Sequence, residues 1–120
     1  MSKILWLQAP EEKDYPAAES YLNLTYDPVQ AKSFVSKLRQ APVQTFKSKD
    51  IFRASGLSLA GVSNGHVQRD IEKIKDGEKL SPLLLVRDAV HGKVIVADGY
   101  HRLCAVYSLD EDADIPCKIA

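Results

Sequence analysis

The chain has 120 residues, of which 45% are hydrophobic and 27% charged, so its composition favours one folded globular domain over a disordered chain. Sixteen basic residues balance sixteen acidic ones, and this zero net charge argues against a broad nucleic-acid surface, which normally needs a basic excess. The two cysteines form no CxxC motif, and the apolar run at residues 4–7 is too short for a signal peptide or a membrane span. We therefore expect reduced thiols, a cytoplasmic location and no membrane partner.

Residues 1–41 predict a helical hairpin. One short helix is expected over about 16–24. The second begins at Asp27 and Pro28, because Asp is a favoured N-cap and Pro is tolerated at the first helical position. Pro42 ends this helix. Its apolar face is formed by residues at helical spacing, namely Ala31, Phe34, Val35 and Leu38.

Residues 42–120 predict a mixed core that completes a single domain. A continuous apolar run over 82–86 is typical of a strand buried on both faces. Pro116, in the last strand, suits an edge or a strand start. The fold class is therefore α/β (α+β), a small mixed sheet with flanking helices. In chain order we expect a strand at 43–47, a turn or short helix through 52, a loop at 56–65, a helix at 67–75, strands at 82–86 and 93–97, a helix from about 100, an acidic loop at 110–114 and a strand at 115–119.

The passage from the strand at 93–97 into the next helix predicts an anion site. Gly99 tolerates the unusual backbone angles of a sharp turn. The helix then exposes backbone N–H groups at about Tyr100, His101 and Arg102, at the positive end of its dipole. Arg102 adds a planar fork suited to phosphate, and His101 adds a donor that titrates near neutral pH. The prediction depends on open N–H groups and on a guanidinium that the protein itself does not use.

With this turn, residues 80–119 resemble the ParB/sulfiredoxin superfamily. The shared pattern is an apolar strand after Pro82, a hairpin, the turn Asp98-Gly99-Tyr100-His101-Arg102, a helix with small residues and a strand with Ile115-Pro116. The resemblance implies a ParB-like fold in which this turn holds the phosphate of a nucleotide, with His66 in a second site segment. It also implies ATP, ADP or CTP with Mg²⁺ as the cofactor.

The sequence departs from the superfamily's pattern in two places. In sulfiredoxins the turn reads Gly-Gly-Cys-His-Arg with a nucleophilic Cys, and the matching residue here is Tyr100, so sulfiredoxin activity is not expected. The superfamily's kinases for free serine have a turn similar to Asp-Gly-His-Thr-Arg, which Asp98, Gly99 and Arg102 match. Those kinases also use a carboxylate directly after a His, whereas His66 here is followed by Val67.

Several of these residues have a structural alternative. Asp98 is a candidate general base or Mg²⁺ ligand, and it is equally a candidate helix N-cap. His66 follows Asn-Gly and is a candidate turn residue, while His101 could satisfy a backbone carbonyl. Arg69 and Lys73 could line the cleft or form a solvated helix face. These alternatives stay open at the level of the sequence.

The expected function is nucleotide-phosphate binding, as a small-molecule phosphotransferase or nucleotide hydrolase with Asp98 and His101 as catalytic residues. The alternative is a non-catalytic binding or regulatory module, favoured by Tyr100 and Val67 at positions where the superfamily places reactive groups. A ParB-like nuclease or DNA-binding protein is disfavoured by the zero net charge, and a DNA-binding helical domain like that of ParB partition proteins is not expected here. The acidic loop lacks the spacing of a calcium loop, so no protein-only metal site is predicted.

Overall fold

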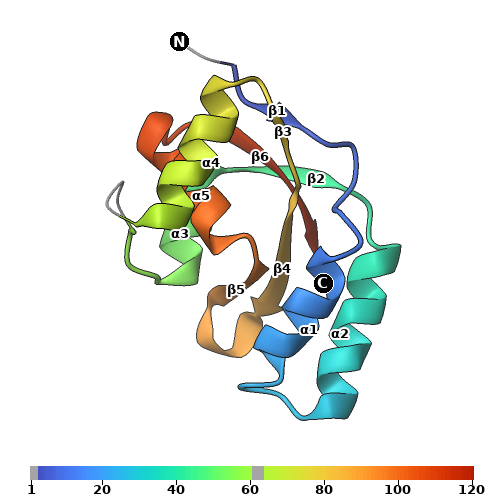
Figure 1. The fold of residues 1–120 in the computed structure, drawn as a ribbon. Coiled ribbons are helices and arrows are strands. Elements are labelled where there is room, and N and C mark those ends of the chain that lie inside the picture. The colour runs from blue at the N-terminus through green and yellow to red at the C-terminus, as the bar shows by residue number, and fades with distance from the viewer. Residues whose placement is uncertain (1–2, 61–63) are drawn as a thin grey trace.

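The computed structural model describes residues 3–60 and 64–120, where five α-helices cover the two faces of a four-stranded mixed sheet (Figure 1). This arrangement confirms the predicted α+β class. The strand order is β2-β6-β4-β5. The main elements are α1 (Asp14–Leu22), α2 (Pro28–Gln40), β2 (Gln44–Lys47), α3 (Ser48–Ser55), α4 (Gly65–Lys75), β4 (Leu83–Asp88), β5 (Lys93–Asp98), α5 (Tyr100–Leu109) and β6 (Asp114–Ile119).

The sheet combines parallel and antiparallel pairs. β6 is antiparallel to β2 and parallel to β4, and β4 is antiparallel to β5, to which it is joined by the one-turn 3₁₀ helix η1 (Ala89–His91). The expectation that Pro116 marks an edge or a strand start is wrong, since β6 lies inside the sheet and begins at Asp114. Pro116 pairs with Thr45 of β2, and the ladder with β4 starts only at Cys117, so no β4 bond needs the missing N–H.

β4 separates two hydrophobic cores. Its residues alternate between the faces of the sheet. Leu83 and Leu85 pack with α3, α4 and α5, whereas Leu84 and Val86 pack with α1 and α2. All four are at most 1% exposed, which confirms the predicted strand buried on both faces. Each such side chain contributes about 1.5–3 kcal/mol of hydrophobic stabilisation.

The helical hairpin forms as predicted, with one shift at its start. Asp27 Oδ1 accepts from the Gln30 N–H at 2.8 Å, and Pro28 is the first helical residue, so the predicted N-cap of α2 is confirmed. α1 begins at Asp14 rather than near Pro16, because a proline within the first helical turn removes no intrahelical hydrogen bond.

In the described ranges, no helix combines the length and apolar character that a bilayer crossing requires.

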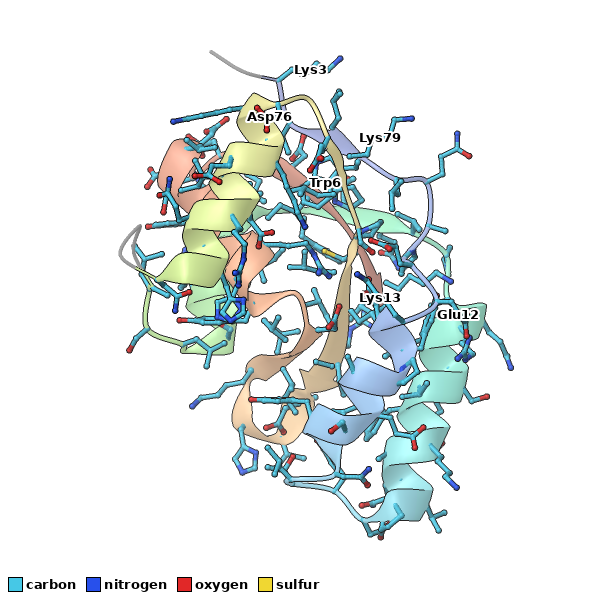
Figure 2. All side chains as sticks on the ribbon, in the orientation of Figure 1. Lys3, Trp6, Glu12, Lys13, Asp76 and Lys79 are labelled. Carbon is cyan, nitrogen blue, oxygen red and sulfur yellow. The ribbon has the colours of Figure 1, made fainter. Side chains whose placement is uncertain are left out.

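The segment before α1 forms a short parallel ladder that the sequence did not predict. β1 (Leu5–Trp6) pairs with β3 (Lys79–Leu80), and the Leu7 N–H donates to the Leu80 carbonyl at 2.8 Å. Figure 2 labels Trp6 and Lys79 along this ladder. Strands of two residues are too short to show an alternating pattern, so no sequence signal marks them.

The predicted loop at 56–65 contains the start of α4. Gly56 ends α3 in the left-handed region, as expected of a helix-ending glycine. Asn64 caps α4 by accepting from the N–H groups of His66 and Val67, at 2.9 and 3.3 Å. The interpretation of His66 as a turn residue is therefore wrong, because it lies in the first turn of α4. Residues 61–63 of this predicted loop, including Gly61, lie outside the described residues.

Candidate functional site

The predicted site residues come together at one pocket. α4 and α5 pack side by side (Figure 1). Their first turns line a pocket of about 250 Å³. α4 also contributes Arg69 and Lys73, for which the sequence left two roles open, lining the cleft or forming a solvated helix face. The pocket is lined by His66, Arg69, Asp70 and Lys73 from α4 and by Asp98, Gly99, Tyr100, His101 and Arg102 from the β5–α5 turn.

Gly99 is required at the turn for two reasons. Its φ of 108° lies in the region that residues with a side chain rarely adopt, and a Cβ there would lie 2.8 Å from Leu83 Cγ and 2.9 Å from Arg102 Nη2. Gly99 is also the N-cap of α5, so the interpretation of Asp98 as the cap is wrong. A glycine has no side chain to accept from the first turn of the helix. The first N–H groups of α5 therefore have no side-chain cap, which leaves them available to an anion.

Arg102 does not present the free guanidinium that the sequence predicts. Its Nη2 donates to Asp98 Oδ2 at 2.8 Å and lies 3.7 Å from Asp14 Oδ2. The side chain is 18% exposed, and Nε is buried with no hydrogen-bond partner among the described residues. A guanidinium bound by two carboxylates is held in place. Arg102 therefore orients Asp98 at the wall of the pocket, and its predicted role as a phosphate ligand is wrong. Any anion site here depends instead on the N–H groups of α5 and on the cations of α4.

Asp14, which sequence reasoning missed, completes this buried polar group. It is 4% exposed and accepts from the hydroxyl of Ser81, whose Oγ in turn accepts from the Glu11 N–H at 3.0 Å. These contacts join α1 to the segment before β4 and, through Arg102, to α5. In sequence, an acidic residue at a helix start indicates only a favourable interaction with the helix dipole. No local pattern could connect Asp14 to a site formed by the other end of the chain.

The environment of Asp98 suits proton transfer. Burial penalises its charged form and raises the pKa of the carboxyl above its ordinary value, against the opposing effect of the Arg102 guanidinium. A carboxyl with a raised pKa is a better general base near neutral pH than an exposed one. Asp98 lies at the pocket wall, since it lines the cavity together with the first turn of α5.

The pocket fits Mg²⁺ only in combination with a phosphate. Asp70 and Asp98 supply the carboxylates at its wall, and carboxylate oxygens are ligands that Mg²⁺ accepts. Within residues 3–60 and 64–120, no group of three or more His, Cys, Asp or Glu side chains is placed to hold a metal ion. Mg²⁺ commonly uses one or two carboxylates with substrate phosphates and water. The residues present are compatible with that mode.

Two histidine rings stack at the meeting point of α4 and α5. The ring centroids of His66 and His101 are 4.7 Å apart, with an interplanar angle of 26°. Arg69 Nη2 lies 2.8 Å from His66 Nδ1, and because a guanidinium only donates, Nδ1 accepts. Burial and then the neighbouring His66 lower the pKa of His101, so this imidazole is neutral at pH 7.

Arg69 and Lys73 give the pocket its positive charge. Both line the cavity, which places them in the cleft rather than only on a solvated face. Among the residues that the structure describes, neither lies within 4.0 Å of a carboxylate. Their charges are thus not neutralised by an ion pair, in contrast to that of Arg102. Unpaired cations beside a helix N-terminus are an arrangement that favours an anion.

Tyr100 closes one side of the pocket. Its hydroxyl donates to the carbonyl of Ser58, in the segment after α3, and its ring centroid is 5.2 Å from that of His101. Burial raises the pKa of this phenol, so it stays protonated near neutral pH. Tyr100 therefore supplies a fixed aromatic wall and no nucleophile.

A larger cavity of about 590 Å³ lies elsewhere, at the end of the molecule near β1. It is lined by Trp6, Ile4 and Leu109 together with charged residues, and it shares no residue with the pocket between α4 and α5. None of the residues that the sequence predicts to bind phosphate lies there. Size alone therefore does not identify the functional site, and the smaller polar pocket is the candidate.

Comparisons with models of known protein families, with curated proteins and with solved structures gave no match. The resemblance to the ParB/sulfiredoxin superfamily therefore stays a prediction. What the pocket binds is inferred from its own geometry and charge, which the two helix starts and the Gly99 turn determine.

Proposed function

We propose that this protein binds the phosphate of a nucleotide in the pocket between α4 and α5, as a small ParB/sulfiredoxin-like protein. One observation supports this most directly. α5 begins at Gly99, which leaves its first N–H groups without a side-chain cap, beside Arg69 and Lys73, which have no carboxylate partner among the described residues. Backbone donors, the helix dipole and two cations together favour an oxyanion.

The proposed activity is that of a small-molecule phosphotransferase or nucleotide hydrolase. Asp98 would accept the proton of the attacking hydroxyl or water, because its raised pKa and its place at the pocket wall suit a general base. Neutral His101 would hydrogen-bond the phosphate or move a proton beside it. Asp70 would hold Mg²⁺ together with the phosphate, where the ion would neutralise charge. Arg102 would keep Asp98 in position.

A specific observation also favours the alternative of a non-catalytic binding or regulatory module. Arg102 is engaged by two carboxylates and the Tyr100 hydroxyl by a backbone carbonyl, so two groups of the turn already serve the protein's own structure. In this alternative the pocket still takes the nucleotide phosphate. The enzyme and the non-catalytic module would both bind the nucleotide, but only the enzyme would convert it.

Thermal unfolding with ATP, ADP or CTP, each with Mg²⁺, tests the binding. A ligand at one hundred times its Kd stabilises the folded state by about 2.7 kcal/mol, which is easily measured as a rise in Tm. Unchanged Tm values with all three nucleotides at millimolar concentration would contradict the proposal. Released phosphate then separates the two functions. Turnover that disappears in Asp98→Asn supports an enzyme, and binding without turnover supports the module.

A further inference from the structure

A second pocket lies against the same turn as the phosphate pocket. It has a volume of about 380 Å³, within the range of small-molecule sites. Asp98, Gly99, Tyr100 and His101 line both pockets, so a single bound molecule could occupy them together. The walls that belong to this pocket alone are less polar and come from Ala17 and Tyr21 of α1, Leu57 after α3, and Val96 and Ala97 of β5.

These walls are suited to a planar aromatic group. Tyr21 is 45% exposed and Leu57 is 38% exposed, so two large apolar side chains remain open to water. Covering such surface is favourable. Three rings, those of Tyr21, Tyr100 and His101, line the pocket, and aromatic rings prefer to stack on one another in offset or edge arrangements. Aliphatic chains would not use these rings in that way.

Space continues beyond this pocket. A smaller cavity of about 90 Å³ shares Tyr21, Leu57 and Val96 with it and reaches Lys93 and Ser55. The two cavities therefore adjoin at Tyr21. Polar groups on the rim of a bound ring would meet Lys93 there.

α1 is fixed where it forms this wall. Asp14, in its first turn, is bound by the Ser81 hydroxyl and lies 3.7 Å from Arg102 Nη2. Tyr21 lies two helical turns further along the same α1, which packs against β5. The position of α1 at Tyr21 is thus tied to the turn that forms the phosphate pocket.

We propose that this second pocket binds the aromatic base of the nucleotide, with Tyr21 as its main contact. The inference rests on the proposed function, because the base would enter only with its phosphate. The turn at residues 98–101 lines both pockets, so the sugar that joins base and phosphate would lie against it. The N-terminal helical hairpin therefore contributes directly to ligand binding, and its residue Tyr21 determines part of the specificity.

Calorimetric titration with ribose 5-phosphate, AMP and CMP tests this base pocket. We expect at least one nucleotide to bind about tenfold more tightly than ribose 5-phosphate, since stacking of a base on an aromatic side chain is of that order. Tyr21→Ala should remove this difference and leave the affinity for ribose 5-phosphate unchanged. Tyr21→Phe should retain it. Leu24→Ala is the matched control, because Leu24 follows α1, is exposed and lines neither pocket.

The possible failures are distinguishable. Equal affinities for all three ligands, unaffected by Tyr21→Ala, would overturn the base pocket and leave phosphate binding intact. Absence of binding by all three would overturn the proposed function and the base pocket with it. Equal weakening of ribose 5-phosphate and nucleotide in Tyr21→Ala, with a lowered Tm, would show a structural role of Tyr21 and also overturn the inference.

Discussion

The guanidinium of Arg102 lies 3.7 Å from Asp14, so the last helix of the chain is joined to the first by a buried ion pair. The same Nη2 donates to Asp98 at 2.8 Å. One cation thus compensates two carboxylates, and the charge balance of the site depends on a residue outside the predicted core. Removing the cation and removing Asp14 should therefore have very different effects.

Arg102→Leu should destabilise the protein by about 3–5 kcal/mol, because it leaves the buried carboxylates of Asp14 and Asp98 without their cation. Asp14→Asn should cost about 1–2 kcal/mol, since Arg102 keeps Asp98 and only the charge at position 14 is lost. Urea unfolding monitored by circular dichroism gives both values. Similar losses of unfolding free energy in the two variants would contradict the idea that the Arg102 guanidinium compensates both carboxylates.

Gly99→Ala should lower the free energy of unfolding by about 2–4 kcal/mol. The substitution adds backbone strain of about 1–3 kcal/mol at φ 108°, and the new Cβ overlaps with Leu83. Gly65→Ala is the matched control, because a Cβ there meets nothing within 4 Å at a helix start. The control should be neutral or slightly stabilising. Equal stability of the two variants in urea would contradict the geometry of the turn.

The raised pKa of Asp98 has a consequence for stability that depends on pH. Between the ordinary carboxyl value of 3.8 and its raised pKa, the folded chain binds more protons at this site than the unfolded chain. The contribution of Asp98 to the free energy of unfolding therefore falls as the pH rises through this window. Asp98→Asn removes that contribution. The stability of Asp98→Asn minus that of the wild type should increase with pH over the window, and a constant or decreasing difference in urea titrations would refute it.

Arg69→Gln and Lys73→Gln should each weaken nucleotide binding by about tenfold, because each removes a charge-assisted contact to phosphate. Lys75→Gln, on the same helix but outside the pocket, is the control and should bind as the wild type does. Isothermal titration at two salt concentrations measures the effect. A loss of affinity in all three variants would indicate a diffuse electrostatic attraction rather than a built site.

The pKa of His101 should report on occupancy of the pocket. In the free protein, burial and the neighbouring His66 hold this pKa below the ordinary value of a histidine. A bound phosphate stabilises the imidazolium, so inorganic phosphate should raise this pKa. The ring protons of His101, followed by NMR across a pH titration, measure the shift. His91, exposed at the β4–β5 connection and absent from both pockets, provides the internal control.

The sequence predicted the elements whose signals are local. The cap at Asp27, the doubly buried strand and the glycine turn each depend on a few adjacent residues, and the structure confirms all three. The convergence of His66 with the turn was expected from the resemblance, and the stacked rings of His66 and His101 now show it. Local chemistry was sufficient for these features.

Features that depend on distant residues were not predicted. The ladder of β1 and β3 has no periodic signal, and Asp14 meets Arg102 only because the chain folds back over its whole length. The expectation of a free Arg102 fork was wrong for this reason only in part, since Asp14 is distant in the chain whereas Asp98, its nearer partner, lies four residues before it. Of the two roles left open for Asp98, the N-cap is wrong, because Gly99 takes the N-cap position one residue later.

The alternation of side chains along β4 limits how the protein could be shortened. Residues 42–120 look like a minimal core, yet removing α1 and α2 would expose the side of the sheet formed by Leu84, Val86 and Ala97. It would also leave Arg102 without Asp14. Fragments lacking the hairpin are therefore expected to aggregate, and any loss of nucleotide binding in them would say nothing about the chemistry of the turn.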